Sequence, residues 1–402
     1  MLLQKGIAAY KRSTGLERAG RIPALDGLRA FFVFSVMAYH IWQQSWLTPS
    51  LNLLGHQVSM NPYLRTGYLW VDGLLLLSAF LLYLPHARRR EAGRPFAAQA
   101  GFYRRRAARI MPTYVLNLLV VFFVVALPEK RYATAWQGIR DWLAHLSFTH
   151  PWFIFSSRNT PLNGALWTLG VEVQFYLIFP LLARAFHRMP LLTYLGAAGL
   201  AFAFRGYAMT MLESVMYINQ LPNFLDVYMN GIVAAVVYAR FERQKDEAPQ
   251  RILMTAMTAA AVMGLSMLVL AQARVSSFEE LRLSQMRIRY LQSVLTALLV
   301  LGSSLGLSGI RLLLGNQLMA FLAAISYQVY LWHQVLAVQF RTWRIPASEH
   351  VNPNMVGDRG WQVAYVLLVT ACTLVISTAV TYLVEQPLTR RLTRRRGAGR
   401  TS

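Results

Sequence analysis

The amino-acid sequence predicts an all-α integral membrane protein, a bundle of about ten transmembrane helices with both termini in the cytoplasm. Hydrophobic residues make up 55% of the 402 residues and charged residues only 14%, whereas a soluble domain usually carries about 25% charged residues. The apolar residues are clustered in runs of roughly 18 residues or more, the length that crosses a bilayer. Basic residues are concentrated in alternate segments between these runs, as expected for loops on one side of a membrane.

The apolar runs define the predicted helices. They cover residues 24–45, 67–86, 110–127, 162–183, 190–208, 222–239, 252–271, 290–308, 318–340 and 361–384. The fifth and the eighth are the least sharply bounded. No Pro-, Gly- or Ser-rich linker interrupts the chain, and the short basic tails 1–23 and 385–402 leave no room for an appended soluble domain. We therefore expect residues 1–402 to form one membrane-embedded domain.

The distribution of charge predicts the orientation in the membrane. With the N-terminus assigned to the cytoplasm, the inner segments hold 26 Lys and Arg residues and the outer segments 13. This positive-inside bias, together with an even number of spans, places both termini in the cytoplasm of a multi-pass cell-membrane protein. The net charge of +23 does not indicate nucleic-acid binding, because it follows the loops and no nucleic-acid module is present. Lipid headgroups are the expected partners of most of these basic residues.

The single cysteine and the N-terminal segment indicate that the chain has no internal disulfide, no cysteine-based metal site and no cleaved signal peptide. Cys372 is the single cysteine, so the chain forms no internal disulfide and no cysteine-based metal site, and we expect no metal. Residues 1–23 are basic and lack a small-residue cleavage site after an apolar core. The first span is therefore expected to be a retained helix and not a signal peptide.

The first span carries three ionisable residues, Asp26, Arg29 and His40. Arg29 and His40 are eleven residues apart, so at about 100° per residue they share a helix face, separated by roughly 16 Å along the axis. Asp26 lies one turn before Arg29. In the predicted orientation, Asp26 and Arg29 lie near the cytoplasm and His40 lies in the outer half of the membrane. Asp26 and Arg29 are equally consistent with a structural ion pair, and His40 with a polar packing residue, but their common face favours a functional site.

Other spans also carry polar side chains. Those predicted to line the interior are Asp72 and Ser78 in the second span, Trp167, Glu172 and Tyr176 in the fourth, Asp226 in the sixth, and Ser326, Tyr330 and His333 in the ninth. Each alone is compatible with hydrogen bonding between packed helices. Together they predict a polar interior.

A basic cluster precedes the third span on the predicted cytoplasmic side. It contains Arg104, Arg105, Arg106 and Arg109, followed by Tyr114. Arg106 and Arg109 share a helix face, and arginine binds phosphate groups in a bidentate manner. These two are therefore predicted to bind a phosphorylated ligand, whereas Arg104 and Arg105 fit an ordinary positive-inside cluster.

Taken together, these motifs resemble those of the integral-membrane acyltransferase family 3, the sugar and macrolide O-acyltransferases, from about residue 21 to 390. The matching motifs are Arg21 through Ala30 with His40; Val71-Asp72 through Phe80; Arg106 through Tyr114; Leu166 through Tyr176; Ser326 through His333; and Glu385-x-Pro387. Six motifs in the family order make the resemblance specific. The second motif departs from the family pattern, because Leu74-Leu75 replaces paired Phe and Ala79 replaces Gly.

The resemblance implies ten spans, a cytosolic acyl-CoA donor, usually acetyl-CoA, and an acceptor hydroxyl on a carbohydrate or glycosylated molecule. It implies that His40 is the principal catalytic residue with Arg29 beside it, and we place Asp26 and Glu172 in the same group. Arg106 and Arg109, with Tyr114, would contact the donor. Some relatives carry a second extracytoplasmic domain, and here we expect the membrane domain itself to handle the acceptor.

Alternatives to this interpretation remain. Membrane-embedded Asp, Glu and His also occur in proton-coupled transporters, although no internal repeat or pair of Gly/Pro-broken helices is visible. A non-catalytic scaffold would leave the polar motifs unexplained. The outer loop 128–160, rich in Trp and His, fits either a cover over the bundle or an interfacial aromatic belt. The sequence leaves open the oligomeric state, the acyl chain, and whether the acceptor is an envelope glycan or a soluble glycosylated compound.

Overall fold

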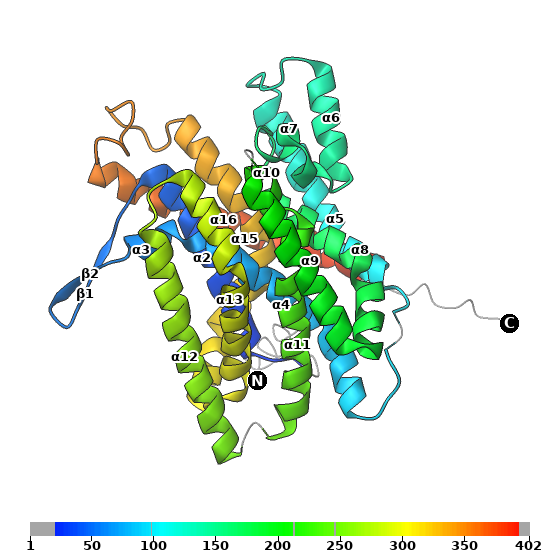
Figure 1. The fold of residues 1–402 in the computed structure, drawn as a ribbon. Helices are drawn as coiled ribbons and strands as arrows, with labels where there is room; N and C mark the ends of the chain where they lie inside the picture. The colour runs from blue at the N-terminus through cyan, green and yellow to red at the C-terminus, as the bar shows by residue number, and fades with distance from the viewer. Residues whose placement is uncertain (1–20, 98, 212–213, 245–246, 394–402) are drawn as a thin grey trace, which may run out of the picture. The chain divides into compact units, whose positions relative to one another are not determined.

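The computed structural model describes residues 21–97, 99–211, 214–244 and 247–393. These residues are almost entirely helical (Figure 1). They divide into two compact units. The first unit comprises the described residues up to Tyr39, Thr48–Ala97 and Phe224–Tyr327, and the second comprises His40–Leu47, Ala98–Asn223 and the described residues from Gln328 onward.

Two helices run from one unit into the other. They are α2 (Ala24–Ser45) and α15 (Gln317–Thr342). The first unit also contains η1 (Gly67–Leu69), α3 (Asn61–Arg65), α4 (Trp70–Glu91), α11 (Leu225–Phe241), η6 (Glu242–Gln244), α12 (Ala248–Ala273), α13 (Phe278–Leu305) and α14 (Ser308–Gly315). In this unit α4 packs on α11, and α12 lies beside α13 (Figure 1).

A short antiparallel hairpin is the one departure from helix among the described residues. It is formed by β1 (Ser50–Leu53) and β2 (His56–Ser59). The all-α prediction did not include it, because two strands of four residues produce no periodic apolar signal. All four residues of β2 are exposed, so this strand adds nothing to the core.

Close packing of α4 on α11 explains how the chain accommodates Ala79 at a position where the family motif has glycine. A β-carbon added to Gly231 of α11 would lie 2.4 Å from the Leu76 carbonyl oxygen and 3.0 Å from the Ala79 β-carbon. The small residue that allows the two helices to approach is therefore on the opposite helix. The methyl group of Ala79 is fully buried and occupies the space that Gly231 leaves.

The second unit contains the remaining elements. They are α5 (Phe102–Val121), η2 (Phe122–Ala126), α6 (Ala135–Leu146), η3 (His150–Trp152), α7 (Ile154–Ser157), η4 (Gly164–Leu166), α8 (Trp167–Arg188), α9 (Pro190–Thr210), α10 (Ser214–Ile218), η5 (Leu221–Phe224, whose last residue belongs to the first unit), α16 (Arg359–Val380), η7 (Thr381–Glu385) and α17 (Gln386–Thr393). Here α5 packs on α17 and α8 on α9. Both η2 and η7 are π-helical turns, a feature often found near functional sites.

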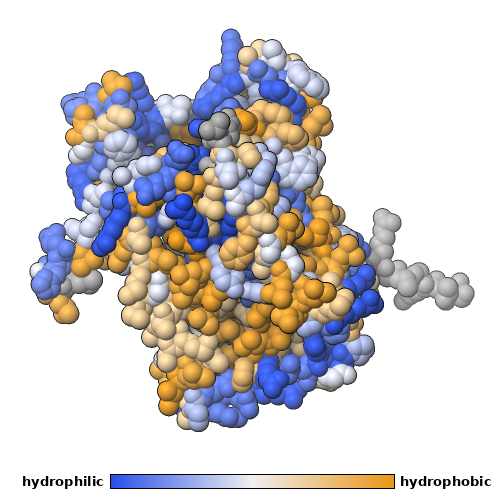
Figure 2. Space-filling model, viewed as in Figure 1, coloured by the Kyte–Doolittle hydropathy of each residue, from blue (hydrophilic) through white to orange (hydrophobic). Residues whose placement is uncertain are grey.

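Nine helices among the described residues are long and apolar enough to cross a membrane, and the chain is a multi-pass membrane protein. Hydrophobic residues cover the outward side of α12 (Figure 2), where Val262, Met263 and Met267 are exposed. The eighth predicted span, 290–308, is confirmed as part of α13. The predicted total of ten is not reached, because α9, which matches 190–208, is not one of the nine.

Arg205 accounts for the lower apolarity of α9. It lies inside the helix and is only 3% exposed. Its Nε donates to Asn223 Oδ1 at 2.9 Å, and its guanidinium also donates to the Asn223 carbonyl oxygen at 2.8 Å. The exposed side of α9 is apolar and includes Leu191, Leu195 and Phe202.

Candidate functional site

Two histidines meet inside the second unit. His40 of α2 and His333 of α15 are 293 positions apart in sequence, yet His40 Nδ1 lies 2.8 Å from His333 Nε2. His333 is fully buried and His40 is partly exposed. The structure thus joins the predicted catalytic histidine to a residue that the sequence marked only as an interior candidate.

The hydrogen bonds of this pair define its tautomers. His333 Nδ1 is 2.8 Å from the Val329 carbonyl oxygen, which can only accept, so Nδ1 carries the proton. In neutral His333 the lone pair is then on Nε2, and His40 Nδ1 must be the donor between the rings. Neutral His40 consequently has its own lone pair on Nε2. This is the arrangement of a general base whose ring is oriented by a second group.

Tyr330 supports this pair from one turn earlier on α15. Its hydroxyl donates to the Ala165 carbonyl oxygen at 3.0 Å and lies 2.6 Å from the Thr168 hydroxyl at the start of α8. The Tyr330 and His333 rings lie 5.6 Å apart. The predicted interior residue Tyr330 therefore anchors α15 to α8 beside the histidines.

Two asparagines anchor the same part of α15. Asn117 of α5 and Asn163 both donate to the Leu331 carbonyl oxygen, at 3.1 and 2.8 Å, and Asn163 also donates to Asn117 Oδ1 at 3.0 Å. All three groups are buried. Because buried amides are costly unless they are hydrogen-bonded, this network holds α5, η4 and α15 in one arrangement around His333.

A polar stripe runs along α8 from Thr168 through Glu172 to Tyr176. These residues are four apart and therefore share a face, and Tyr176 lies about 12 Å from Thr168 along the helix axis. The Tyr176 hydroxyl donates to Glu172. The Arg106 guanidinium lies 5.5 Å from the centre of the Tyr176 ring and 5.7 Å from that of Phe102, within cation–π range. The stripe links the neighbourhood of the histidines to that of Arg106.

The four arginines of the basic cluster differ in environment. Arg104, Arg105 and Arg109 are exposed, and Arg106 is largely covered. The Arg106 Nε atom is buried and has no hydrogen-bond partner among the described residues. Arg109 lies within electrostatic range of Glu385. The environment of Arg106 therefore differs from those of Arg104, Arg105 and Arg109, and the predicted role of Arg106 and Arg109 in binding a phosphorylated ligand stays a prediction.

Gln328 of α15 connects this helix to α5 and to η7. Its amide nitrogen donates to Thr113 Oγ1 at 3.0 Å and to Glu385 Oε2 at 2.7 Å, and it is fully buried. Glu385 ends the π-helical turn η7. Sequence analysis did not select Gln328, which lay at a variable position of the motif from Ser326 to His333.

Tyr114, predicted to contact the donor, has its hydroxyl directed elsewhere. It donates to the His145 carbonyl oxygen at 2.9 Å, and its ring stacks on Phe148 at 4.8 Å. Tyr114 follows Arg106 by eight residues, about 12 Å along α5. Its observed role is to join α5 to the loop 128–160.

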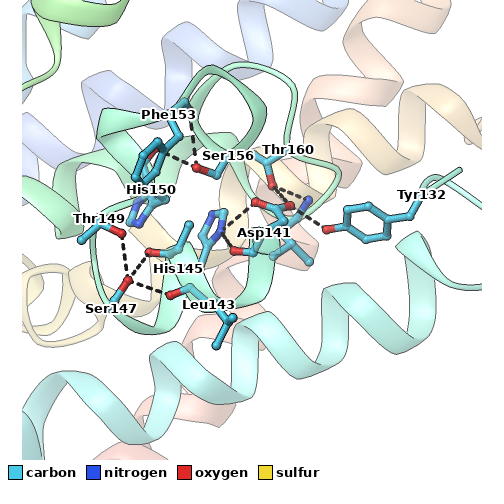
Figure 3. A network of polar contacts seen from close by, with 12 residues as sticks. Tyr132, Asp141, Leu143, His145, Ser147, Thr149, His150, Phe153, Ser156 and Thr160 are labelled. Atoms are coloured by element: carbon cyan, nitrogen blue, oxygen red, sulfur yellow. Dashed lines mark hydrogen bonds and ion pairs between the residues drawn. The ribbon is translucent and has the colours of Figure 1, made fainter. Parts of the chain in front are cut away.

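That loop is folded around a buried polar network (Figure 3). Asp141 Oδ2 accepts from the Tyr132 hydroxyl at 2.6 Å and from the Thr160 hydroxyl at 2.8 Å. His145 Nδ1 lies 2.9 Å from the Asp141 carbonyl oxygen and 3.1 Å from Oδ1. Burial and Asp141 raise the pKa of Tyr132. An aromatic belt alone would not bury these groups, so the loop is a folded element with a buried polar core of its own.

His150 lies against His145 in this network. The two rings stack with centres 4.3 Å apart. Burial, with a smaller contribution from His145, lowers the pKa of His150 to about 3. His150 is therefore neutral at physiological pH, and no repulsion between two imidazolium rings opposes the stacking.

The cytoplasmic end of the predicted first span shows a different pairing from the one expected. Asp26 accepts from Arg21, while Arg29 lies within electrostatic range of Asp26. Arg29 belongs to the first unit and His40 to the second. The ion pair at the helix entrance is thus formed with Arg21, which was noted only as the start of a motif.

Asp72 forms a buried ion pair in the first unit. Arg289 Nε donates to Asp72 Oδ2 at 3.0 Å, and the two side chains are 0% and 2% exposed. The Arg289 guanidinium also lies 4.1 Å from the centre of the Phe224 ring. The sequence predicted Asp72 as one of the polar residues that line the interior. The structure gives it a charged partner on α13.

The remaining residues that were predicted to line the interior form only local hydrogen bonds or are partly buried. Asp226 is buried in the first turn of α11 and accepts from the Val227 amide at 2.9 Å. Ser326 is buried and donates to the Ala323 carbonyl oxygen within its own helix at 2.8 Å. Ser78 and Trp167 are partly buried. None of these contacts assigns a chemical role to the four residues.

Several of the groups that build the site were not selected from the sequence. They are Thr168, Asn117, Asn163, Gln328 and Asp141. Asp141 and His145 share a face of an amphipathic helix, a detectable pattern. Single buried amides carry no such signal, because their partners lie on distant helices.

The sequence of this helical membrane protein matches that of a family of acyltransferases. The profile of a family described as an acyltransferase domain matches residues 22–382, and the chain belongs to this acyltransferase family 3. The resemblance inferred from the motifs is therefore confirmed. No solved structure matches the chain.

Individual relatives share between a quarter and a third of their matched residues with this chain. A predicted O-acetyltransferase of Staphylococcus aureus (strain COL) is 24% identical over 348 residues, which cover 82% of this chain and 52% of the relative. Acyltransferase MdmB of Streptomyces mycarofaciens is 31% identical over 179 residues, 43% of this chain and 42% of MdmB. O-acetyltransferase OatA of Staphylococcus aureus (strain NCTC 8325) is 28% identical over 185 residues, 43% of this chain and 26% of OatA. The chain spans about half the length of the first curated relatives that it matches.

Proposed function

We propose that this chain is a membrane O-acyltransferase that moves an acyl group, in the simplest case acetyl, from cytosolic acyl-CoA to a hydroxyl of a carbohydrate or glycosylated compound. The observation that carries the proposal is the hydrogen bond between His40 and His333. It orients an imidazole as a base inside a chain of an acyltransferase family. The names of OatA and MdmB, an O-acetyltransferase and an acyltransferase, support transfer to oxygen.

The proposed chemistry needs one base. The thioester of the donor is already activated for acyl transfer. What the enzyme must supply is a base that removes the proton of the acceptor hydroxyl as its oxygen attacks the thioester carbon. His40 Nε2 takes that proton, and His333 Nε2 keeps accepting from His40 Nδ1–H when the ring becomes an imidazolium. The carbon–sulfur bond then breaks, the acyl group stays on the acceptor oxygen, and the thiolate of CoA takes up the proton.

The donor is proposed to bind with its phosphates near Arg106. The Arg106 guanidinium is held over Tyr176 and Phe102 and has a buried Nε atom, so little side-chain entropy remains to be lost on binding an anion. The phosphates and the thioester of acyl-CoA are joined by a flexible arm. The stripe from Tyr176 to Thr168 offers a polar path of about 12 Å for that arm.

Replacing Arg106 by alanine is expected to weaken CoA binding about 10- to 100-fold, because a charge-assisted hydrogen bond contributes roughly 1.5–3 kcal/mol. Arg104→Ala is the matched control, since Arg104 is exposed on the same helix, and it should change the affinity less than threefold. Isothermal titration with CoA in nanodiscs measures both. A lower melting temperature of Arg106→Ala with unchanged CoA affinity would show that Arg106 only packs against Tyr176.

We propose that α9 is a tenth span, so that both termini lie in the cytoplasm. Its apolar outer side suits lipid, and Arg205, which lowers its mean hydropathy, is buried against Asn223. Arg289 is likewise buried and so is not a loop charge, which strengthens the positive-inside bias. In a Cys372→Ser background, a cysteine at Trp136 should react with an impermeant maleimide in intact cells and one at Arg90 only after lysis. The reverse pattern would refute this topology.

The rival proposal is a proton-coupled transporter. Family membership favours acyl transfer, and a direct test separates the two. Membranes containing the protein should transfer label from acetyl-CoA to a glycoside acceptor, and vesicles without CoA should show no uptake of that acceptor. Uptake without CoA and no acyl transfer would favour the transporter.

A further inference from the structure

The second unit contains a surface groove that the proposed chemistry does not use. Its volume is about 670 Å³. One wall is the segment from η3 to just beyond α7, with Trp152, Phe153, Ile154, Phe155 and Asn159, and the other is α10 and the residues after it, with Met216, Tyr217 and Gln220.

The lining of this groove combines aromatic rings with amide groups. Trp152 and Phe153 are 50% and 42% exposed, although burying such rings would stabilise the fold. The side chains of Asn159 and Gln220 form no hydrogen bond with any other residue that the structure describes. Rings and amides are thus both left available for a ligand.

The first wall is held rigidly from below. The buried Ser156 hydroxyl donates to the His150 carbonyl oxygen at 3.0 Å, and His150 itself stacks on His145 of the buried network (Figure 3). The Arg140 guanidinium of α6 lies 4.4 Å from the centre of the Phe155 ring. The aromatic residues of the wall therefore project from a well-supported segment.

The second wall is held as firmly. Asn223 donates to the carbonyl oxygens of Tyr217 and Ile218, both at 3.2 Å, and is itself bound by Arg205. The Tyr217 and Tyr207 rings meet edge to face at 5.6 Å. Across the groove, Ser157 lies 3.5 Å from the Met216 sulfur. Because both walls are braced, a ligand would bind at little cost in ordering.

The chemistry of the lining selects a class of ligand. No residue that lines the groove carries a charge, so the groove is not matched to a phosphate or a carboxylate. A neutral sugar has apolar C–H faces that pack on aromatic rings and hydroxyl edges that bond with amides. A lipid chain would use the rings but leave the amides without partners.

A chain of contacts through α8 connects one wall of the groove to the residues around the histidine pair. A β-carbon on Gly170 of α8 would lie 2.6 Å from Pro151 Cγ, so the residue before Trp152 packs on the first turn of α8. That turn contains Thr168, which bonds Tyr330 beside His333. The groove and the histidine pair are thus both built on one end of α8.

We propose that this groove, lined by Trp152, Tyr217, Asn159 and Gln220, binds a neutral carbohydrate portion of the acceptor. The inference rests on the proposed function, because it assigns the groove to the acceptor of that reaction. It requires no second domain for acceptor recognition.

The test measures binding of neutral trisaccharides of glucose and of N-acetylglucosamine by saturation-transfer NMR. The protein is placed in nanodiscs free of glycoside detergents, which would compete. Trp152→Ala is expected to weaken binding about tenfold, while Trp152→Phe retains most of it. Trp136→Ala is the matched control, because Trp136 is 64% exposed on α6 outside the groove, and it should bind like the wild type.

The outcomes separate this inference from the proposed function. His40→Ala should abolish transfer but keep saccharide binding, and Trp152→Ala should raise the KM for a saccharide acceptor about tenfold with kcat nearly unchanged.

If transfer occurs and Trp152→Ala leaves binding and KM unchanged, the groove proposal fails and the enzyme stands. If saccharide binds through Trp152 without any acyl transfer, the groove stands and the enzyme proposal fails. If no saccharide binds the wild type and Trp152→Ala only weakens association with lipid, the groove belongs to an interfacial belt and the proposal is overturned.

Discussion

Replacing His40 by alanine is expected to lower the rate of acyl transfer by about 10²- to 10⁴-fold, the usual contribution of a general base. The KM values for donor and acceptor should change little, because the base acts on the reacting hydroxyl and not on the bulk of either substrate. Transfer of label from acetyl-CoA in nanodiscs measures the rate. His56→Ala, an exposed histidine in the β-hairpin, is the control and should retain full activity.

The partner His333 offers a sharper version of the same test. His333→Ala removes the acceptor for His40 Nδ1–H and should lower kcat by a smaller factor, about 10- to 100-fold, the range of a group that positions a functional imidazole. His333→Gln restores an acceptor oxygen and should recover part of the loss. If His40→Ala is as active as the wild type, the base assignment is wrong. If His333→Gln is no better than His333→Ala, the hydrogen bond between the rings is not what matters.

The second large effect concerns stability. Asp72→Ala is expected to destabilise the protein by about 3–5 kcal/mol, because it leaves the Arg289 charge buried without its counter-ion. Thermal unfolding in detergent, followed by tryptophan fluorescence, measures the loss. The comparison variant is Glu129→Gln, which breaks the partly exposed ion pair with Arg131 and should cost less than about 1 kcal/mol.

A further variant distinguishes the structural role of Asp72 from a catalytic one. Asp72→Asn combined with Arg289→Gln removes both charges and should recover much of the lost stability, since a neutral buried pair needs no counter-ion. Full stability together with lost transfer in this double variant would instead indicate a catalytic role for Asp72. Equal destabilisation by Asp72→Ala and Glu129→Gln would contradict the account of the buried pair.

Much of the fold was predictable because it depends on local signals. Hydropathy located nine of the ten predicted spans as helices that suit a membrane, and helical periodicity placed Asp26, Arg29 and His40 on one face. The apolar run 190–208 was also predicted as a span, but α9, which matches it, is not among the nine helices. Its Arg205 binds Asn223, which lies beyond the end of α9, a contact that no local signal shows.

The sequence predicted candidate residues of the site better than it predicted the contacts between them. His40, His333, Tyr330, Glu172, Tyr176 and Arg106 were all selected from the sequence. Thr168 and Asn163, which hold α15 in place beside His333, were not selected, because nothing within their own segments distinguishes them. The carboxylates Asp26 and Glu172 were grouped with His40, whereas the structure places a second imidazole beside it.

The sequence by itself determined the membrane class, most of the helices, the family and the histidine at the proposed centre. These follow from composition, from the 3.6-residue period and from motifs within single helices, all of which are local properties of the chain. The tertiary structure alone decided that His40 meets His333 across 293 positions and that Asp72 meets Arg289 across 217. It also decided that residues 152–159 and 216–220 form a groove. Such pairings depend on how packed helices bring distant side chains to hydrogen-bond distance, a matter of a few tenths of an ångström, and no pattern within one helix specifies that.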